Sequence, residues 1–382
     1  MNFDQLSEEQ QTCYYAILDH VVNKKSGILI LGAFAGTGKT TLIRCVLQEL
    51  RLNQISFMSA AFTGRAAAQL SKSGIESKTI HSILYSPVLD TNGNLLRWER
   101  KPISEIRENC GSAIFIDEAS MVPKKIHDEL VSIGLPIVYI GDFAQLPPVP
   151  SPEDEDPDFN VMTSLDNVPV LTLTKNHRVD PDAAGIAYIT NHLRSNNSIP
   201  RVSMPALKLT PKSTVMNVRY HVANEFDIIL CGTNKTRKKI NELVRAARGF
   251  DEFRIPTVDE TVVCLKNTVV NGVVLNNGEL FKVTMVIPGE SVSSFILLSL
   301  DSDERKIVTV VVENDTWLSE EQPSSRDYQH FGFGYCISCH KSQGSQFKKV
   351  LFIDENVSFF LDQQKFRYTA TSRASKYLEI GI

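Results

Sequence analysis

A glycine-bearing segment, GAFAGTGKTT, follows the apolar run ILIL and precedes a helical pattern. The free backbone N–H groups of such a loop, together with the N-terminus of the following helix, form a cradle for phosphate. Lys39 adds a cation for the β- and γ-phosphates, and the Thr40 hydroxyl is a ligand for Mg²⁺. The strict pattern has glycine where this chain has Ala33, beside Gly32, which is a mild departure. The order of strand, loop and helix favours a phosphate site over a chance match.

Adjacent carboxylates end a second apolar run, AIFIDEAS. Asp117 at the strand tip can hold Mg²⁺ through water, and Glu118 can accept a proton from an attacking water. Two acids often end a strand without doing chemistry. With a phosphate loop upstream, however, the pair favours hydrolysis, and the two motifs predict a nucleoside triphosphatase that uses ATP and Mg²⁺.

A third segment, GDFAQLPPV, follows the apolar run PIVYI. Ligand-binding groups of a parallel sheet collect beyond the carboxyl ends of its strands, so Gln145 is expected close to the γ-phosphate. Its amide can hydrogen-bond that phosphate or the attacking water and so report whether the phosphate is present. Two prolines stiffen the segment after it. An ordinary turn with an incidental glutamine is the alternative.

The bulk properties allow two or three packed domains in 382 residues with 42% hydrophobic composition. A net charge of −4 gives no sign of nucleic-acid binding, although a local basic groove is compatible with it. The chain has seven cysteines, no basic-then-apolar leader and no apolar run near the ~18 residues of a membrane span. These features favour a soluble protein in a reducing compartment. The one CxxC pair, Cys336 and Cys339, lacks a second ligand pair for zinc, and we interpret both as buried small hydrophobes.

Strand-like runs alternate with helical patterns, first through about 175 residues and again towards the C-terminus. This alternation, with strands apolar on both faces, predicts two α/β domains with parallel sheets. An Asn-Gly between β-capable arms predicts a hairpin insertion, and β-rich runs separated by turn residues predict a small antiparallel barrel. The predicted domains are 1–175 with the hairpin at about 85–105, then 176–275 together with 328–382, with the barrel at 276–327.

Nine segments occur in the order of the superfamily-one helicase motifs: GAFAGTGKT, AAFTGRAAAQL, TIHSIL, FIDEASM, GDFAQLPPV, LTKNHR, CGTNKTR, SCHKSQGSQF and YTATSRA. The chain resembles the RecD/Dda-like branch of that family from about Leu6 to the C-terminus. The resemblance implies two RecA-like domains with ATP in the cleft between them and an SH3-like barrel as the second insertion. Arg178 and Arg373 would reach the γ-phosphate and stabilise transition-state charge, with a surface salt bridge as the alternative for each.

The resemblance also assigns residues to the nucleotide. Gln10 would contact adenine, although Ser7 and Gln10 equally fit a helix capping box, and the two roles can be shared. The other assigned residues are Ala35, Gly36, Thr37, Gly38, Lys39, Thr40 and Thr41 of the phosphate loop, and Gly344 and Gln346 of a late motif.

Single-stranded DNA would cross both domains. Hydroxyls, amides and imidazoles suit sequence-independent phosphate contact. The resemblance points to Thr63, Thr79, His81, Asn234, His340 and Ser342. His81 by itself is more often a satisfied core histidine. Phe62 replaces the usual proline and either stacks on a base or packs inward. Trp98 in the hairpin either covers the last base pair of a duplex or anchors the hairpin on its own domain.

These observations together predict an ATP-dependent DNA helicase that acts as a monomer on single-stranded and forked duplex DNA. Travel in the 5′-to-3′ direction is implied by the resemblance alone. Single-strand binding, replication or recombination proteins are the expected partners, no membrane is expected, and the expected setting is the cytoplasm of a bacterial or phage-infected cell. The alternatives are a nucleotide-switched binding or remodelling ATPase that does not unwind, and an RNA-directed helicase.

Overall fold

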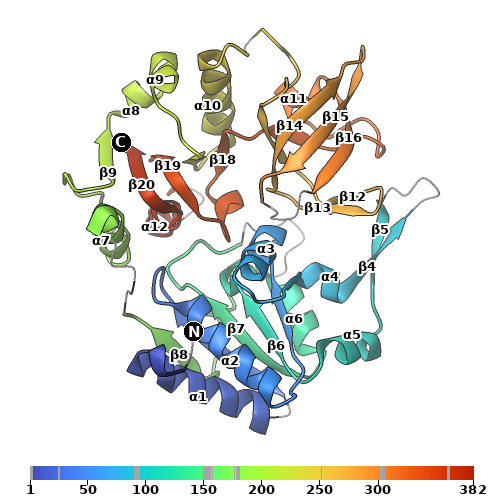
Figure 1. The fold of residues 1–382 in the computed structure, drawn as a ribbon, viewed down its shortest axis with the longest axis vertical. Helices are drawn as coiled ribbons and strands as arrows, with labels where there is room; N and C mark the ends of the chain where they lie inside the picture. Colours follow the sequence, from blue (N-terminus) through green and yellow to red (C-terminus); the bar gives the residue numbers. More distant parts are fainter. Residues whose placement is uncertain are drawn as a thin grey trace. The chain divides into compact units, whose positions relative to one another are not determined.

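The computed structural model describes residues 3–24, 26–89, 95–148, 156, 158–175, 177, 181–250, 252–301, 306–358 and 362–382. The chain divides into two compact units (Figure 1). The first unit comprises Met1–Ser86 and Glu99–Val179, and the second comprises Pro87–Trp98 and Asp180–Ile382. In the described part of the chain, no helix has the length and apolarity needed to cross a membrane.

The first unit is built on a six-stranded sheet in the order β3-β2-β6-β7-β1-β8. Its strands are β1 (Gly27–Ala33), β2 (Met58–Ala61), β3 (Lys78–Thr79), β6 (Ile114–Asp117), β7 (Pro136–Gly141) and β8 (Val170–Leu173). The registered pairs are parallel, so the carboxyl ends of β6, β7 and β1 lie side by side at one edge. This is the parallel α/β fold that the alternating pattern predicts.

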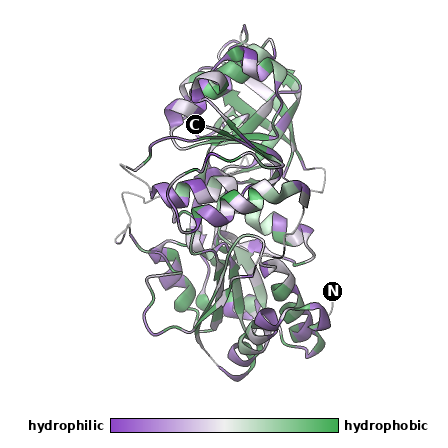
Figure 2. Ribbon diagram, turned by 90° about the vertical axis from the view of Figure 1, so that its left-hand side faces the viewer, coloured by the Kyte–Doolittle hydropathy of each residue, from purple (hydrophilic) through white to green (hydrophobic). Residues whose placement is uncertain are grey.

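Helices cover both faces of this sheet: α1 (Glu8–Asn23), α2 (Lys39–Leu52), α3 (Gly64–Lys72), α4 (Ile80–Leu84), α5 (Ile103–Cys110) and α6 (Lys124–Val131). Successive residues of β1 point to opposite faces. Leu29 and Leu31 pack in one core with α1, α2 and α3, whereas Ile30 packs in a second core with α4, α5 and α6. In Figure 2 the strands are mostly hydrophobic, and the helices alternate hydrophobic and hydrophilic residues.

A two-stranded sheet, β4 (Tyr85–Leu89) with β5 (Leu95–Arg100), lies inside the predicted hairpin range 85–105. The Asn-Gly pair that suggested this hairpin lies outside the described residues. The last part of the range belongs instead to α5, which begins at Ile103.

The second unit contains a five-stranded parallel sheet in the order β18-β10-β19-β20-β9. Its strands are β9 (Leu207–Thr210), β10 (Ile228–Cys231), β18 (Cys336–Ser338), β19 (Phe347–Ile353) and β20 (Ala374–Gly381). The helices of this part are α7 (Ala184–Leu193), α8 (Lys212–Val215), α9 (Val218–Ala223), α10 (Asn234–Ala247) and α12 (Gln363–Thr371). Two parallel-sheet lobes in one chain agree with the predicted fold class.

A five-stranded antiparallel sheet in the order β16-β15-β14-β11-β17 completes the second unit. Its elements are β11 (Thr261–Cys264), β14 (Leu280–Ile287), β15 (Val292–Ser299), β16 (Ile307–Glu313) and β17 (Phe331–Phe333), with α11 (Thr316–Ser319) beside it. Two of these strands, β11 and β17, lie outside the predicted insertion 276–327. They join because Val262, Phe331 and Phe333 are needed to close a core around Trp317.

A further hairpin joins β12 (Thr268–Val270) to β13 (Val273–Leu275). Asn271 and Gly272 form its turn with φ of 49° and 78°. Positive φ at both central residues is typical of a two-residue hairpin turn. The segment VVNGVV, with Asn-Gly between β-branched residues, is the sequence signal for this turn.

Candidate active site

The phosphate loop connects β1 to α2, as the sequence predicts. Gly36 and Gly38 have φ of 85° and 78°, a backbone conformation that glycine adopts without strain. The Thr37 hydroxyl donates to the Phe34 carbonyl at 2.9 Å, which braces the loop from within. Lys39 begins α2, so its side chain rises from a helix N-terminus, where anions are favoured.

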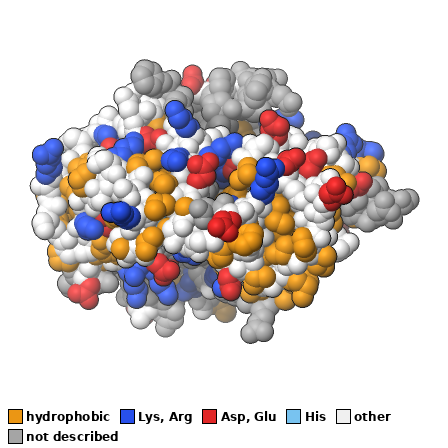
Figure 3. Space-filling view, turned by 90° about the horizontal axis from the view of Figure 1, so that it is seen from above, with side chains coloured by type: hydrophobic (Ala, Val, Ile, Leu, Met, Phe, Trp, Pro, Cys, Tyr) orange, Lys and Arg blue, Asp and Glu red, His pale blue; other side chains and the backbone are white. Residues whose placement is uncertain are grey.

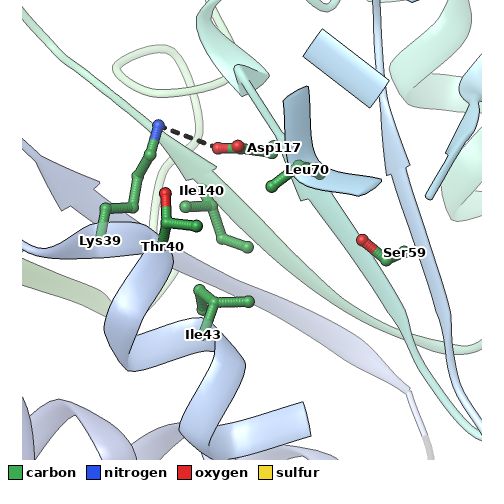
Figure 4. A pocket seen from close by; sticks show the side chains of 7 residues that line it. All are labelled: Lys39, Thr40, Ile43, Ser59, Leu70, Asp117 and Ile140. Carbon is green, nitrogen blue, oxygen red and sulfur yellow. Dashed lines mark ion pairs between the residues drawn. The ribbon is translucent and has the colours of Figure 1, made fainter. Parts of the chain in front are cut away.

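Lys39 makes the central contact of the site (Figure 4). Its Nζ lies 2.9 Å from Asp117 Oδ1 and 3.9 Å from Glu118 Oε1. Burial lowers the pKa of Lys39, but the carboxylates of Asp117, Glu118 and Asp142 outweigh burial and raise it. The lysine is therefore a fixed cation that faces the acids of β6.

A small pocket adjoins this ion pair. It is lined by Lys39, Thr40, Ile43, Ser59, Leu70, Asp117 and Ile140 (Figure 4). Thr40 and Asp117 thus offer a hydroxyl and a carboxylate on one pocket, and oxygen ligands of this kind suit Mg²⁺. Among the described residues, no group of three or more His, Cys, Asp or Glu side chains could hold a metal ion. One carboxylate and one hydroxyl fit a Mg²⁺ that keeps waters and takes other ligands from phosphates.

Glu118 has an unusual backbone conformation. Its φ of 51° and ψ of 42° lie in the left-handed region, which costs a non-glycine residue on the order of 1–3 kcal/mol. Its Oε2 is buried and has no hydrogen-bond partner among the described residues. A strained residue with an unused carboxylate oxygen fits a base that awaits a water molecule.

The segment after β7 also lies at this edge, because Gly32 of β1 is paired with Gly141 of β7. Asp142 is 1% exposed, and it accepts the backbone N–H of Ala144 at 3.0 Å. Gln145 is 4% exposed, and its Oε1 has no hydrogen-bond partner in the described part of the chain. A buried, unused amide oxygen at this edge is consistent with the predicted sensor.

Gly32, which precedes the departure from the strict loop pattern at Ala33, is required by a packing contact. A Cβ added to this glycine would lie 1.7 Å from Phe143 Cε2 and 2.2 Å from Cζ. The ring of Phe143 therefore lies directly on the backbone of β1. Gly32 serves the contact with the Gln145 segment, and Ala33 is simply buried. Sequence analysis missed Phe143.

Gln10 does take part in a capping box, and it also contacts the phosphate loop. Ser7 accepts the Gln10 N–H at 3.4 Å, and Gln10 Oε1 accepts the Ser7 N–H at 2.9 Å. Its Nε2 donates to the Thr37 carbonyl at 3.1 Å. A Cβ on Gly38 would lie 2.4 Å from that nitrogen. The capping reading is confirmed, and contact with adenine stays a prediction.

Glu9, which sequence analysis did not single out, holds the segment after β8. Its carboxylate accepts the Thr174 N–H at 2.9 Å and the Lys175 N–H at 3.2 Å. The His177 N–H donates to the Gly36 carbonyl at 2.8 Å. The start of the LTKNHR motif is thereby tied to both α1 and the phosphate loop. Arg178 itself lies outside the described residues.

The predicted DNA-contact residues of the first unit follow β2 and β3. Thr63 caps α3 by accepting the Ala66 N–H at 3.2 Å, and Thr79 caps α4 by accepting the Ser82 N–H at 3.1 Å. His81 stacks on Tyr85 with ring centroids 4.5 Å apart. Phe62 is partly buried and packs against the core that contains Ile30.

In the second unit, two predicted DNA-contact segments follow the paired strands β10 and β18. Asn234 begins α10, and its Oδ1 accepts from Arg237 Nε at 3.3 Å. His340 begins a short turn, and burial lowers its pKa to about 4. Ser342 is fully buried and donates its hydroxyl to the Cys339 carbonyl at 2.6 Å. Contact between Ser342 and DNA would require that bond to break.

Arg373 is buried and joined to the late nucleotide motif. Its Nη1 donates to the carbonyl of Ser345, between Gly344 and Gln346, at 3.2 Å. Its Nε donates to the Thr369 carbonyl at 3.1 Å. These contacts place Arg373 against the backbone of the segment that contains Gly344 and Gln346.

Two other predictions concern the hairpin and the cysteines. Trp98 lies in β5 and is half-buried. Cys336 lies in β18, which ends at Ser338, so Cys339 does not continue the strand and is instead the N-cap of the turn that begins at His340. Both thiols are buried, and burial raises the pKa of the Cys339 thiol to about 12. This agrees with small buried hydrophobes.

A phosphate loop, a lysine paired with strand-end acids and a buried glutamine at one edge of a parallel sheet define a P-loop nucleoside triphosphatase. Family models add the subclass. Residues 5–204 match the model described as "AAA domain", and residues 333–380 match "UvrD-like helicase C-terminal domain". The chain belongs to the first of these families, and the two matches together place it among the superfamily-one helicases of the Pif1/Dda-like group.

Two curated relatives support this placement. The ATP-dependent DNA helicase Dda of Enterobacteria phage T4 is 36% identical over 154 residues, covering 39% of this chain and 34% of that protein. The ATP-dependent DNA helicase Pif1 of a Psychrobacter species is 27% identical over 304 residues, covering 68% of this chain and 45% of that protein. The chain thus spans about a third to a half of these curated relatives.

Solved structures agree on the fold. The Pif1 helicase from Bacteroides in complex with ADP-AlF3 and ssDNA has a TM-score of 0.60, is 20% identical, and covers 98% of this chain and 92% of its own. A structure of two coordinating Pif1 helicases at forked dsDNA has the same TM-score and identity and is covered over 91% of its length. The two parallel sheets are therefore the two RecA-like domains of a Pif1-like fold.

Proposed function

We propose that this protein is an ATP-dependent DNA helicase that hydrolyses ATP, moves along single-stranded DNA and unwinds duplex. The observation that carries the proposal is the Lys39–Asp117 ion pair, with strained Glu118 beside it, at the sheet edge where Gln145 is buried. Lys39 would bind the β- and γ-phosphates, Glu118 would accept a proton from the attacking water, and Gln145 would sense the terminal phosphate. Family membership supports this assignment.

Magnesium belongs to the proposal. Thr40 and Asp117 would hold Mg²⁺, directly and through water, and the ion would supply charge neutralisation for the transferred phosphoryl group. Gly36, Gly38 and the backbone N–H groups around them would hold the phosphates. Ala35, Thr37, Thr41, Gly344 and Gln346 would complete nucleotide binding.

The proposed arginine fingers are Arg178 and Arg373. Arginines in this role typically accelerate phosphoryl transfer on the order of 10³–10⁵-fold. The hydrogen bonds of Arg373 to the Thr369 and Ser345 carbonyls would hold its guanidinium in place beforehand. Gln10, which already contacts the phosphate loop, would bind adenine.

DNA would be held by polar side chains at the carboxyl ends of strands in each unit. Thr63, Thr79 and His81 would serve the first unit, and Asn234, His340 and Ser342 the second. His340 favours hydrogen bonding over charge, because its lowered pKa keeps the ring neutral near pH 7. Figure 3 shows basic, acidic and hydrophobic side chains intermingled on one face of the molecule.

Several finer features remain part of the proposal. The domain limits 1–175, 176–275 with 328–382, and 276–327 stay predictions, as does the SH3-like character of the antiparallel sheet. Phe62 would stack on a base only if it left its core contact, and Trp98 would contact DNA at the hairpin. The proposal also includes monomeric action, 5′-to-3′ travel, action on forked DNA, and partnership with single-strand binding, replication or recombination proteins.

ATP hydrolysis with and without single-stranded DNA tests the proposal, and single-stranded RNA is the comparison. Strong stimulation by DNA is expected, and no stimulation would count against a DNA translocase. Duplexes with only a 5′ tail or only a 3′ tail then test unwinding and direction. Unwinding of the 5′-tailed duplex is expected. Binding without unwinding would favour a nucleotide-switched protein, and stimulation by RNA alone would favour an RNA-directed enzyme.

A further inference from the structure

Glu129 on α6 contacts both strands of the β4–β5 hairpin where they leave the first unit. Tyr85 of β4 donates its hydroxyl to Glu129 Oε1 at 2.6 Å. Arg100 of β5 places Nε 3.2 Å from Glu129 Oε2. One carboxylate therefore joins the beginning of β4, the end of β5 and a helix that packs on the parallel sheet.

Other bonds reinforce this base. Arg100 Nη2 donates to the Ser132 hydroxyl, also near the end of α6, at 3.0 Å. The Lys101 N–H donates to the Leu84 carbonyl, and its Nζ donates to the Ser82 carbonyl, each at 2.9 Å. These bonds therefore join the segments that flank the two strands to each other, and they join the end of β5 to the end of α6.

The network also reaches a predicted DNA-contact residue. The ring of Tyr85 stacks on His81 at 4.5 Å, with the planes 23° apart. Burial, together with the neighbouring Glu129 carboxylate, raises the pKa of Tyr85 to about 12, so its hydroxyl stays protonated and remains a donor. His81, Tyr85 and Glu129 form one connected unit at the base of the hairpin.

A solvent-exposed ion pair usually contributes little to the free energy of folding. Here the carboxylate side chain is only 16% exposed and has partners on two different strands, so its removal would leave the Tyr85 hydroxyl without its acceptor and the Arg100 guanidinium without its counter-ion. Glu129 has no part in the phosphate site described above. Its contacts instead lie at the beginning of β4 and the end of β5.

We propose that Glu129 is a positioning residue for strand separation, which fixes the hairpin against α6 so that movement of the ATP-binding domain is passed to the hairpin. This inference rests on the proposed helicase function. If the inference is right, loss of Glu129 lowers the amount of duplex unwound per ATP hydrolysed. ATP hydrolysis itself continues, because Lys39, Glu118 and Gln145 are unchanged.

The test compares Glu129→Ala with Asp128→Ala. Asp128 is the adjacent carboxylate on the same helix, and its partner is the exposed Lys124. For Glu129→Ala we expect DNA-stimulated ATP hydrolysis within about twofold of the unchanged protein and unwinding of a 5′-tailed duplex at least tenfold slower. Asp128→Ala should match the unchanged protein in both assays. Glu129→Gln keeps one oxygen acceptor and should recover part of the unwinding.

Tyr85→Phe is the second variant, because it removes one hydroxyl without altering the stacked ring. It should also lower unwinding per ATP, and combining it with Glu129→Gln should add less than the two separate losses. Normal unwinding per ATP in Glu129→Ala or, if that variant does not fold, in Tyr85→Phe would overturn the inference.

A fluorescence measurement separates this inference from the proposed function. The chain has two tryptophans, Trp98 in the hairpin and Trp317, which is 1% exposed. Loosening of the hairpin in Glu129→Ala should increase acrylamide quenching of Trp98, with Trp317 as a constant background, and Asp128→Ala should show no change. If quenching is unchanged, Glu129 does not hold the hairpin. If the unchanged protein fails to unwind, the helicase proposal falls, and the role in strand separation falls with it even where quenching increases.

Discussion

Replacing Gly32 with alanine tests the contact that joins the phosphate strand to the Gln145 segment. The new Cβ would lie 1.7 Å from Phe143 Cε2, 2.2 Å from Cζ and 2.6 Å from Cδ2. Carbon atoms pack at about 3.5–4.0 Å, so the ring must move by roughly 2 Å. Overpacking of this kind typically costs about 1–3 kcal/mol of folding free energy.

The functional effect should exceed the loss of stability. Phe143 lies two residues before Gln145, and a misplacement of about 1 Å near reacting groups can reduce turnover 10²-fold. We therefore expect Gly32→Ala to fold with a lower urea midpoint and to hydrolyse ATP at least tenfold more slowly at saturating DNA. Its nucleotide affinity should change much less, because the loop from Phe34 to Lys39 is not displaced directly.

A second substitution identifies the cause. Phe143→Leu in the Gly32→Ala background shortens the side chain that meets the new methyl group and should restore part of the turnover. Phe143→Leu alone should be milder than Gly32→Ala. Urea unfolding and steady-state ATP hydrolysis on the four proteins give the complete cycle. If Gly32→Ala has the midpoint and turnover of the unchanged protein, the structural explanation for this glycine is wrong.

Three other substitutions test the remaining parts of the site. Lys39→Ala should abolish hydrolysis, because it removes the cation that faces Asp117 and Glu118, and unchanged turnover would refute the site. Gln145→Ala should retain ATP affinity but couple it poorly to movement and so unwind poorly, whereas normal unwinding would exclude the sensor role. His340 has a folded pKa near 4, below the ordinary value of 6.5, so the unfolded state binds its proton first as pH falls. Folding stability should therefore fall as pH drops from 6.5 towards 4, by up to about 1.4 kcal/mol per pH unit from this group. His340→Gln should flatten that slope in urea titrations.

The local motifs were predictable because each depends on residues close together in the chain. The positions of Lys39, Asp117 and Gln145 follow from where three strands end, and the strand order places those ends side by side. The capping box at Ser7 and Gln10 is likewise a short-range pattern. Parallel-sheet topology then brings distant motifs to one edge.

The missed contacts join residues that are distant in sequence, and no local pattern indicates that they pair. Phe143 packs on Gly32. Glu9 accepts a hydrogen bond from the backbone N–H of Thr174, and such a bond does not depend on the residue type at that position. Glu129 sits in an ordinary amphipathic helix. Its partners Tyr85 and Arg100 become neighbours only after the hairpin has formed.

The antiparallel sheet shows a different limit. Composition predicts the β-rich runs within 276–327, whereas β11 and β17, with four and three residues, lie outside that range. Their place was decided by the core around Trp317, which needs aromatic side chains from Phe281, Phe295 and Phe331. Membership of the sheet thus follows long-range packing around a buried tryptophan, which local composition does not indicate.

Lys39 connects these observations to a mechanism. In this structure its charge is balanced by Asp117 at 2.9 Å, so a bound phosphate would compete with that carboxylate for the lysine. Asp117 would then need another cation, and its place beside the Thr40 hydroxyl suits Mg²⁺. Glu118 loses its weaker contact with Lys39 in the same exchange, which frees both of its oxygens for a water molecule. When Lys39 exchanges a carboxylate for a phosphate, the metal site would be completed and Glu118 would be released at the same time. Hydrolysis would therefore require a bound nucleotide.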